Sequence, residues 1–153
     1  MAIANVSGTF GLFEGAVETR NEHFEGAQVN FQIEAHSLST NNKERDQHLK
    51  SDIFFDVVQF PKITFNGRIN KEDKGYTLVG ELTIRDTSKT VKLAVEFNGI
   101  GAGRFGDTRA GFELSGQINR KDFGLSWNMF TEAGGLIVGE EIKLHMDIEL
   151  IKE

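Results

Sequence analysis

The densest group of reactive side chains lies in the stretch "NNKERDQHLKSDIFF", residues 41–55. It holds Glu44, Arg45, Asp46 and His48 within five positions. Carboxylates and imidazoles serve enzymes as acids and bases and also bind metals, so this composition raises a catalytic, a metal-binding or a ligand-contacting role. Catalysis would require the groups to converge on one substrate atom. The element that carries them therefore decides what they can do.

Residues 41–50 are predicted to form a short helix. Asn41 is placed to cap its N-terminus, and Glu44, three residues later, completes a capping-box-like pair. Asp46 and Lys50 stand at i,i+4 as an acid–base pair. A helix of about ten residues is not stable alone, so packing must hold it. The apolar residues available for that packing are Leu49, Ile53, Phe54 and Phe55.

Helical geometry spreads the reactive side chains. Arg45 and His48 share one face at i,i+3, whereas Glu44 and Asp46 point elsewhere. Three interpretations stay open: a solvated, self-paired face in which Arg45 ties down a neighbouring loop, a polar rim that meets a ligand head group, and an acid–base site. The spread of the side chains favours the first and disfavours the third.

Strict alternation of apolar and polar residues predicts β-strands along the rest of the chain. The clearest segments are 27–34, 62–70, 76–85, 91–98, 110–119 and 142–150, and segments 4–10 and 12–19 form a further bent strand or strand pair. Turn signals at 70–75, 85–89 and 98–107 give short connections, which favour antiparallel neighbours. About eight strands predict an all-β, antiparallel barrel or sandwich. Closure into a barrel would remove exposed edges, and the helix would lie across one mouth.

Composition narrows the function classes. The 153 residues indicate one domain, and a net charge of -6 argues against a nucleic-acid partner. The chain has no cysteine, its four histidines lack zinc-type spacing, and no GxSxG motif is present. We therefore expect no metal and no cofactor. "GIGAGRFG", residues 99–106, does not open a helix and is interpreted as a hairpin loop.

The sequence shows no apolar run near the roughly 20 residues of a membrane span, so no stable membrane insertion is expected. No signal peptide is visible at the N-terminus. The expected compartment is the periplasm if a signal peptide precedes Met1, and the cytoplasm otherwise.

Thirteen phenylalanines against one tryptophan and one tyrosine indicate either a large aromatic core or an apolar cavity. The segment "INRKDFGLSWNMF", residues 118–130, raises the same alternative. It is either a polar turn followed by core aromatics, or a cavity entrance where Phe123 and Trp127 meet an apolar ligand.

Taken together, the motifs resemble the YceI-like family of lipocalin-shaped bacterial proteins. The resemblance rests on "NKERDQHLKSDIFFDVVQFPKITF", "GELTIRDTSKTVKLAVEF", "GFELSGQINRKDFGLSWN" and "VGEEIKLHMDIEL", in that order, and covers nearly the whole chain. It implies an eight-stranded antiparallel β-barrel with a helix near one mouth. It also implies a long apolar cavity for a polyisoprenoid chain, such as an isoprenoid quinone or a prenyl pyrophosphate. The family has no agreed catalytic residues, so none is assigned.

One departure from the family pattern bears on the barrel. Members of the family usually begin with a further strand, built around a Trp and an "HS...F.V.H" pattern, before the stretch equivalent to "IANVSGTF". Residues 1–153 are thus expected to form a single YceI-like domain without that first strand. An open seam in the barrel, repaired by a homodimer, is one expected consequence.

The predicted function is the carriage or sequestration of an isoprenoid lipid, and not catalysis. The alternatives are an enzyme acting on an apolar substrate with Arg45, Asp46 and His48 as its polar end, and a fully packed barrel without a ligand. Arg45, His48 and Arg120 are the candidates for contact with a head group. The full set of predicted ligand-binding residues is Phe10, Phe31, Ile33, Arg45, His48, Phe54, Phe55, Phe65, Ile84, Leu93, Phe97, Phe112, Leu114, Arg120, Phe123, Trp127, Leu144 and Met146.

Overall fold

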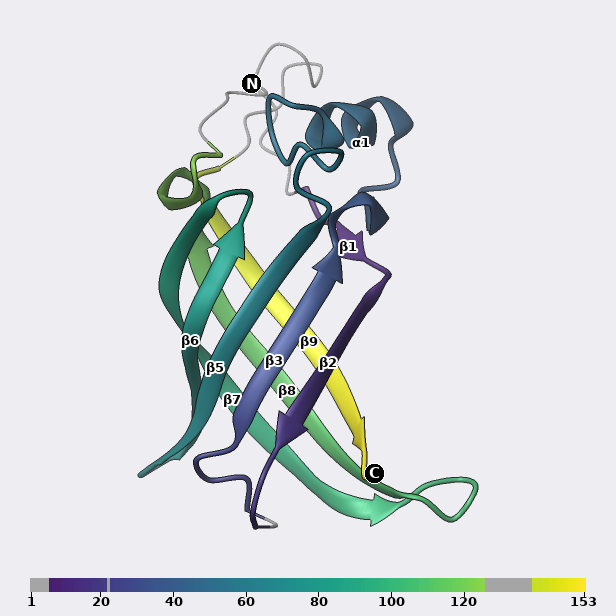
Figure 1. Ribbon diagram of the computed structural model, residues 1–153, viewed down its shortest axis with the longest axis vertical. Coiled ribbons are helices and arrows are strands. Elements are labelled where there is room, and N and C mark those ends of the chain that lie inside the picture. The colour runs from purple at the N-terminus through teal and green to yellow at the C-terminus, as the bar shows by residue number, and fades with distance from the viewer. Residues whose placement is uncertain (1–5, 22, 126–138) are drawn as a thin grey trace.

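A computed structural model describes residues 6–21, 23–125 and 139–153 (Figure 1). Its strands are β1 (Thr9–Phe10), β2 (Phe13–Glu18), β3 (Gln28–Glu34), β4 (Leu38–Ser39), β5 (Lys62–Glu72), β6 (Gly75–Ile84), β7 (Thr87–Ala102), β8 (Thr108–Asn119) and β9 (Glu141–Ile151). The helix α1 spans Lys43–Lys50, and two 3-10 turns, η1 and η2, span Ala35–Ser37 and Arg120–Phe123. No helix of the described residues is long and apolar enough to cross a membrane.

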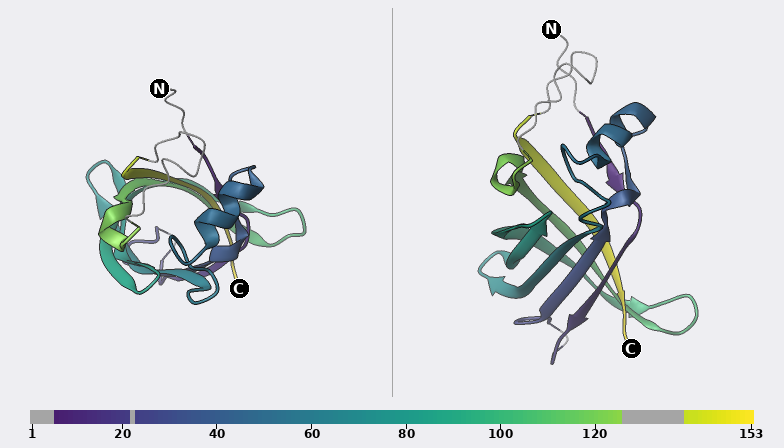
Figure 2. Two further views of the ribbon diagram at one scale, coloured as in Figure 1. Left: turned by 90° about the horizontal axis from the view of Figure 1, so that it is seen from above. Right: turned by 45° about the horizontal axis from the view of Figure 1, so that its top comes forward.

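Seven strands form one antiparallel sheet in the order β2-β3-β5-β6-β7-β8-β9, and β1 pairs with β4 in a separate ribbon. The sheet curls about a long axis, and α1 lies across one end (Figures 1 and 2). The predicted all-β, antiparallel, lipocalin-like fold with a helix near one mouth is confirmed. The ring is less complete than a closed barrel, because in the described part of the chain β2 and β9 are edge strands that do not pair with each other.

The concave face of the sheet carries the apolar half of each alternating pattern. Register places Phe31 opposite Phe65 and Phe65 opposite Leu82, so all three side chains leave the same face. Across the other half of the sheet, Leu114 lies between Val95 and Met146. These residues belong to one continuous apolar cluster that includes side chains from every strand of the large sheet. The period-2 pattern therefore predicted the inner face correctly.

The β7–β8 hairpin reaches further than the sequence pattern indicated. The segment 98–107 was expected to be a loop, but β7 continues to Ala102 and only the residues between the two strands form the turn. A register shift between Phe97 and Gly99 marks a β-bulge, and Gly99 has φ +109°. The bulge absorbs one extra residue while the ladder continues, which a search for unbroken alternation does not detect.

The N-cap of helix α1 lies one residue later than predicted. Asn42, not Asn41, is the N-cap, because its side chain accepts a hydrogen bond from the backbone N–H of Arg45 at 3.0 Å. Asn41 has φ +60° and lies outside the helix. The predicted Asn41–Glu44 capping pair is therefore wrong, since Glu44 is one position too early to be the third helical residue.

The cap assignment gives a direct prediction. Replacing Asn42 with alanine is expected to lower the free energy of unfolding by about 1 kcal/mol, because one N–H of the first helical turn loses its acceptor. Urea denaturation followed by circular dichroism measures the change. Asn41→Gly is the matched control and is expected to be neutral or slightly stabilising, because glycine adopts φ +60° without strain. A larger loss from Asn41→Gly than from Asn42→Ala would contradict the assignment.

Candidate functional site

The interior of the curled sheet is closed by aromatic rings at the end away from α1. Phe24 belongs to the loop between β2 and β3, yet its side chain is only 8% exposed. Its ring meets Phe97 and Phe112 edge-on, with centroid separations of 5.4 and 5.0 Å, and those two rings stack on each other at 4.9 Å. Phe24 thus plugs this end of the interior.

The backbone of Phe24 is held in an uncommon conformation. Its φ of +58° lies in the left-handed region, which bulky side chains rarely adopt. Two hydrogen bonds to β5 fix the chain just after Phe24: Gly26 N–H donates to the Ile69 carbonyl at 2.8 Å, and Ile69 N–H donates to the Ala27 carbonyl at 2.9 Å. The contacts of the inward-pointing Phe24 ring therefore offset the free-energy cost of this strained backbone conformation. No alternating pattern in the sequence indicated this residue.

The opposite end is closed beneath α1. Phe55 contacts Phe10 edge-on at 6.0 Å and Phe54 at 5.0 Å, and Leu49 of the helix is buried beside them in the apolar cluster. Ile53, predicted to share this anchoring role, is 39% exposed. The helix is thus held by packing, as its length requires.

Two charged side chains of α1, those of Arg45 and Asp46, form hydrogen bonds with Thr40, which precedes the helix. Arg45 donates from Nε to the Thr40 hydroxyl at 2.9 Å and from Nη2 to the Thr40 carbonyl at 2.8 Å. The Asp46 carboxylate accepts from Thr40 N–H at 2.9 Å and from the Thr40 hydroxyl. Thr40 is buried, so these contacts satisfy polar groups that would otherwise be costly. Of the three interpretations, the geometry matches the one in which Arg45 ties down a loop.

Of the other two residues of this group, Glu44 is exposed and His48 is half-buried on the helix. Its carbonyl accepts hydrogen bonds from Ser51, from the hydroxyl at 2.6 Å and from the N–H at 3.2 Å, which ends α1. The predicted Asp46–Lys50 pair is replaced by the Asp46 contacts with Thr40. Asp46 thus points to the loop before the helix and not toward a shared substrate position.

Arg120 occupies a different place from the predicted cavity rim. It is 1% exposed, in the turn η2, and donates from Nε to the Gly139 carbonyl at 3.0 Å and from Nη1 to the Leu125 carbonyl. Its own N–H donates to the Glu140 carbonyl at 2.8 Å. The guanidinium therefore joins the end of β8 to the start of β9 from inside. The head-group assignment of Arg120 is corrected accordingly: a buried side chain bonded to backbone has no exposed rim position.

The other predicted ligand-binding residues that the structure describes are either buried or half-buried. Buried ones are Phe54, Phe55, Phe65, Ile84, Leu93, Phe112, Leu114 and Phe123, and half-buried ones are Phe10, Phe31, Ile33, Arg45, His48, Phe97, Leu144 and Met146. Trp127 lies outside the described residues. The half-buried apolar side chains gather on β3 and β9, toward the open side of the sheet, so the interior is most accessible there.

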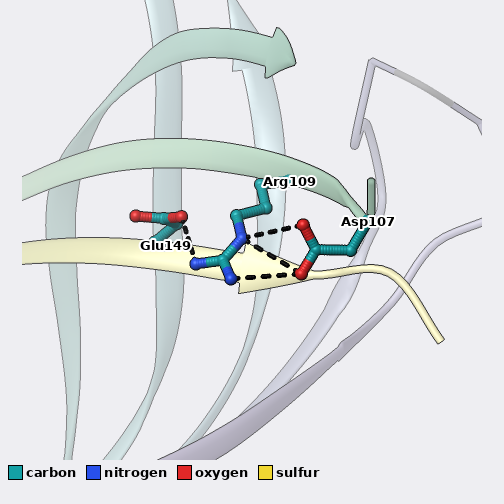
Figure 3. A network of polar contacts seen from close by, with 3 residues as sticks. All are labelled: Asp107, Arg109 and Glu149. Atoms are coloured by element: carbon teal, nitrogen blue, oxygen red, sulfur yellow. Dashed lines mark hydrogen bonds and ion pairs between the residues drawn. The ribbon is translucent and has the colours of Figure 1, made fainter. Parts of the chain in front are cut away.

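A groove of about 710 Å³ lies beside the β7–β8 hairpin. Glycines 99, 101 and 111 line it, with Arg109 at one side. Arg109 donates to Glu149 on β9 at 2.7 Å and to Asp107 at 3.1 Å (Figure 3). The hydrogen bonds to Asp107 and Glu149 raise the pKa of the Arg109 guanidinium above its ordinary value. Arg109 thus stays charged and clamps the hairpin to β9.

A second cluster brings together Glu113, His145 and Asp147, whose ligand-type atoms all lie within 4.8 Å of one another. His145 Nε2 is 3.7 Å from Glu113 and 3.3 Å from Asp147. Sequence spacing could not show this cluster, because strand pairing across β8 and β9 creates it. The three side chains lie on the outer, solvated face, where His145 contacts both carboxylates.

The comparisons with known proteins decide the family. The model of the YceI-like domain matches residues 1–150 of the chain. The chain belongs to the YceI-like family. A relative of this YceI-like domain, the UPF0312 protein SA2479 of Staphylococcus aureus, is 34% identical over 150 residues, covering 97% of this chain and 86% of the relative. The UPF0312 protein YE1254 of Yersinia enterocolitica is 36% identical over 146 residues, covering 95% of this chain and 73% of the relative.

Solved structures of the family share the fold. The Campylobacter jejuni YceI protein aligns with a TM-score of 0.86 at 29% identity, covering 100% of this chain and 88% of that one. BcnA of Burkholderia cenocepacia aligns with a TM-score of 0.78 at 21% identity, covering 94% of this chain and 86% of that one, which shows a common fold alone. A YceI-like fold whose concave face is apolar is consistent with binding a hydrophobic ligand.

Proposed function

We propose that this YceI-like domain binds a long-chain isoprenoid lipid, an isoprenoid quinone or a polyprenyl pyrophosphate, and carries or sequesters it. The observation that carries the proposal is the continuous apolar cluster on the concave face, to which every strand of the large sheet contributes and which aromatic rings close at both ends. An isoprenoid chain offers methyl groups, methylenes and double bonds. Such a chain is stabilised by apolar area at about 25 cal/mol per Å² and needs no hydrogen-bond partner along its length.

The polar residues near α1 support carriage over catalysis. An acid–base enzyme needs Asp46 and His48 to act on one substrate atom, but the Asp46 carboxylate is bonded to Thr40. Arg45 is engaged with Thr40, so His48 stays as the predicted contact for a head group at this end. Homodimer formation and the cellular compartment also stay predictions.

Mass spectrometry of an organic extract tests the proposal directly. The protein is purified without detergent from a bacterial host that makes isoprenoid quinones, and the extract is compared with that of two variants. Met146→Gln places an amide on the inner face at a half-buried position, whereas Lys143→Gln changes only the outer face of the same strand. We expect polyprenyl lipid with the unaltered protein and with Lys143→Gln, and a several-fold loss with Met146→Gln.

The identity of the recovered head group separates the two lipid classes. A quinone ring absorbs in the ultraviolet and is neutral, whereas a pyrophosphate is recovered as a polyanion. Recovery of no polyprenyl lipid, together with failure of added lipid to bind, would show that the apolar interior is ordinary core.

A further inference from the structure

The tip of the β7–β8 hairpin, residues 99–106, combines exposed apolar side chains with a single cation. We propose that this tip docks on the surface of a lipid bilayer, with Phe105 in the interfacial layer and Arg104 at the level of the lipid phosphates. The proposal deepens the proposed function and rests on it for its purpose, because a carrier of an isoprenoid lipid exchanges that lipid with a membrane. The contact is interfacial and reversible, which differs from spanning a membrane.

The composition of the tip is unusual for a surface turn. In its sequence, "GIGAGRFG", Arg104 is the one residue with a polar side chain, and the others are glycine, alanine, isoleucine and phenylalanine. Turns that face water are usually rich in Asn, Asp and Ser, whose side chains form hydrogen bonds with nearby backbone groups. A tip that lacks these residues and carries Ile100 and Phe105 instead suits an environment that is partly apolar.

The two large apolar side chains of the tip are exposed. Phe105 is 85% exposed and Ile100 is 45% exposed. An exposed phenylalanine ring gains free energy when it leaves water for the interfacial layer of a bilayer. The Arg104 guanidinium carbon lies 5.8 Å from the centroid of the Phe105 ring, so the cation and the ring form one unit. The stem of an arginine can accompany the ring into the interfacial layer while the charged group stays among the phosphates.

The hairpin carries the tip away from the rest of the molecule. Figures 1 and 2 show it projecting from the curled sheet, at the end opposite α1. Gly103 N–H donates to the Asp107 carbonyl at 2.7 Å, which closes the turn. Because β7 and β8 are consecutive strands, the tip owes its exposure to the hairpin itself and not to either end of the chain. A flat surface can therefore meet the tip without obstruction from the sheet.

Charge favours the tip over the rest of the surface for contact with an anionic bilayer. The chain carries a net charge of -6, so anionic lipids repel it as a whole. The acid that follows the tip, Asp107, is paired with Arg109 at 3.1 Å. Arg104, by contrast, contacts the Phe105 ring and not a carboxylate of this hairpin. Its charge can therefore attract lipid phosphates and orient the hairpin toward the bilayer.

The tip lies at the end of the interior that Phe24 plugs. Phe97 and Phe112, whose rings contact the Phe24 ring, face each other on the two arms of the same hairpin. The β-bulge between Phe97 and Gly99 joins this aromatic group to the tip. Docking of the tip brings the plugged end of the interior close to the bilayer. The end closed by Phe24 is therefore the entrance that docking would serve.

Flotation with vesicles tests the docking directly. The vesicles contain phosphatidylcholine and phosphatidylglycerol and no isoprenoid lipid, so binding does not depend on a cargo. Phe105→Ser removes the ring at the tip. Val58→Ser is the matched control, because Val58 is a 91% exposed apolar residue in the loop after α1. We expect the unaltered protein and Val58→Ser to float with the vesicles, and Phe105→Ser to bind at least about fivefold more weakly.

A pair of arginine variants measures the contribution of charge. Arg104→Gln removes the cation of the tip, and Arg68→Gln removes an exposed cation of β5. We expect Arg104→Gln to weaken binding to these vesicles at low salt and Arg68→Gln to leave it nearly unchanged. Raising the salt concentration is expected to weaken binding of the unaltered protein in the same way, because salt screens the attraction. Circular dichroism confirms that the variants are folded.

Quenching of fluorescence shows which side chain enters the bilayer. Phe105→Trp and Val58→Trp each add one tryptophan to Trp127, the single tryptophan of the chain, whose emission is measured in the unaltered protein and subtracted. Phospholipids with brominated acyl chains quench a tryptophan that enters the bilayer. We expect quenching of the added tryptophan in Phe105→Trp and none in Val58→Trp.

Three results would overturn the docking proposal: no flotation of the unaltered protein, equal flotation of Phe105→Ser and Val58→Ser, or equal quenching in the two tryptophan variants. Each is distinguishable from a failure of the lipid function. A protein that takes up farnesyl lipid dispersed in water but binds no vesicle keeps the lipid function and loses the docking surface. A protein that binds vesicles through Phe105 but takes up no isoprenoid lipid keeps the docking surface and loses the lipid function.

Discussion

Replacing Arg120 with alanine is expected to destabilise the fold by about 3 kcal/mol, because two buried carbonyl groups lose their donors and a cavity forms. Those carbonyls belong to Leu125 and Gly139, at opposite ends of the segment that joins η2 to β9. Urea denaturation, with the slope of the transition compared between proteins, measures the loss. The stability of Arg120→Lys is expected to lie between that of the unaltered protein and that of Arg120→Ala. One ammonium group cannot reproduce the planar guanidinium, which donates to both carbonyls.

The neighbouring residue is the matched control for Arg120. Lys121 is exposed and forms an ion pair with Glu140 at 2.7 Å, and its hydrogen bond lowers the pKa of the Glu140 carboxyl. Lys121→Ala is expected to raise that pKa toward its ordinary value and to leave the midpoint of the urea transition nearly unchanged. An equal shift of the midpoint by Lys121→Ala and Arg120→Ala would show that charge, and not the buried hydrogen bonds, explains the role of this turn.

The second large effect is expected from Phe24→Ala. Removing the ring eliminates its edge-on contacts with Phe97 and Phe112, which is expected to lower the free energy of unfolding by about 3 kcal/mol. If the interior holds a lipid chain, the same substitution unplugs one end of it. We therefore expect faster uptake of a fluorescent farnesyl lipid, followed as an increase in emission after mixing.

The control for Phe24 is an exposed phenylalanine, Phe105. Phe105, at the tip of the β7–β8 hairpin, is 85% exposed, so Phe105→Ala is expected to change neither the stability nor the uptake rate. A loss of stability in Phe24→Ala without any change in uptake would assign Phe24 to the core alone. Unchanged stability would contradict the packing described for the ring.

Local patterns accounted for much of the fold. Alternation predicted the bounds of β3, β5, β6, β8 and β9 to within a few residues. In a strand with one solvated face, apolar and polar residues alternate along the sequence. It also placed Phe65, Leu93 and Phe112 on the inner face. The burial of Leu49, Phe54 and Phe55 was expected for the same kind of reason, since a short polar helix requires an apolar anchor.

The outcome for the charged residues depended on contacts that sequence spacing does not encode. Asp46 was expected to pair with Lys50 and instead binds Thr40, because a buried backbone N–H and hydroxyl outweigh a weak exposed pair. Arg120 was expected at a solvated rim, but its length lets it reach two carbonyls across a turn. Phe24, in a loop without periodicity, gave no signal at all.

The sequence by itself determined most of the strands of the large sheet, the inner face, the helix and, through its motifs, the YceI-like family, because each depends on residues close together in the chain. Only the tertiary structure decided which ends of the interior are plugged, where Arg45 and Arg120 point, and that β2 and β9 run in the same direction. These features depend on pairing between distant segments. Such pairing is fixed when the whole sheet curls and not by any local pattern.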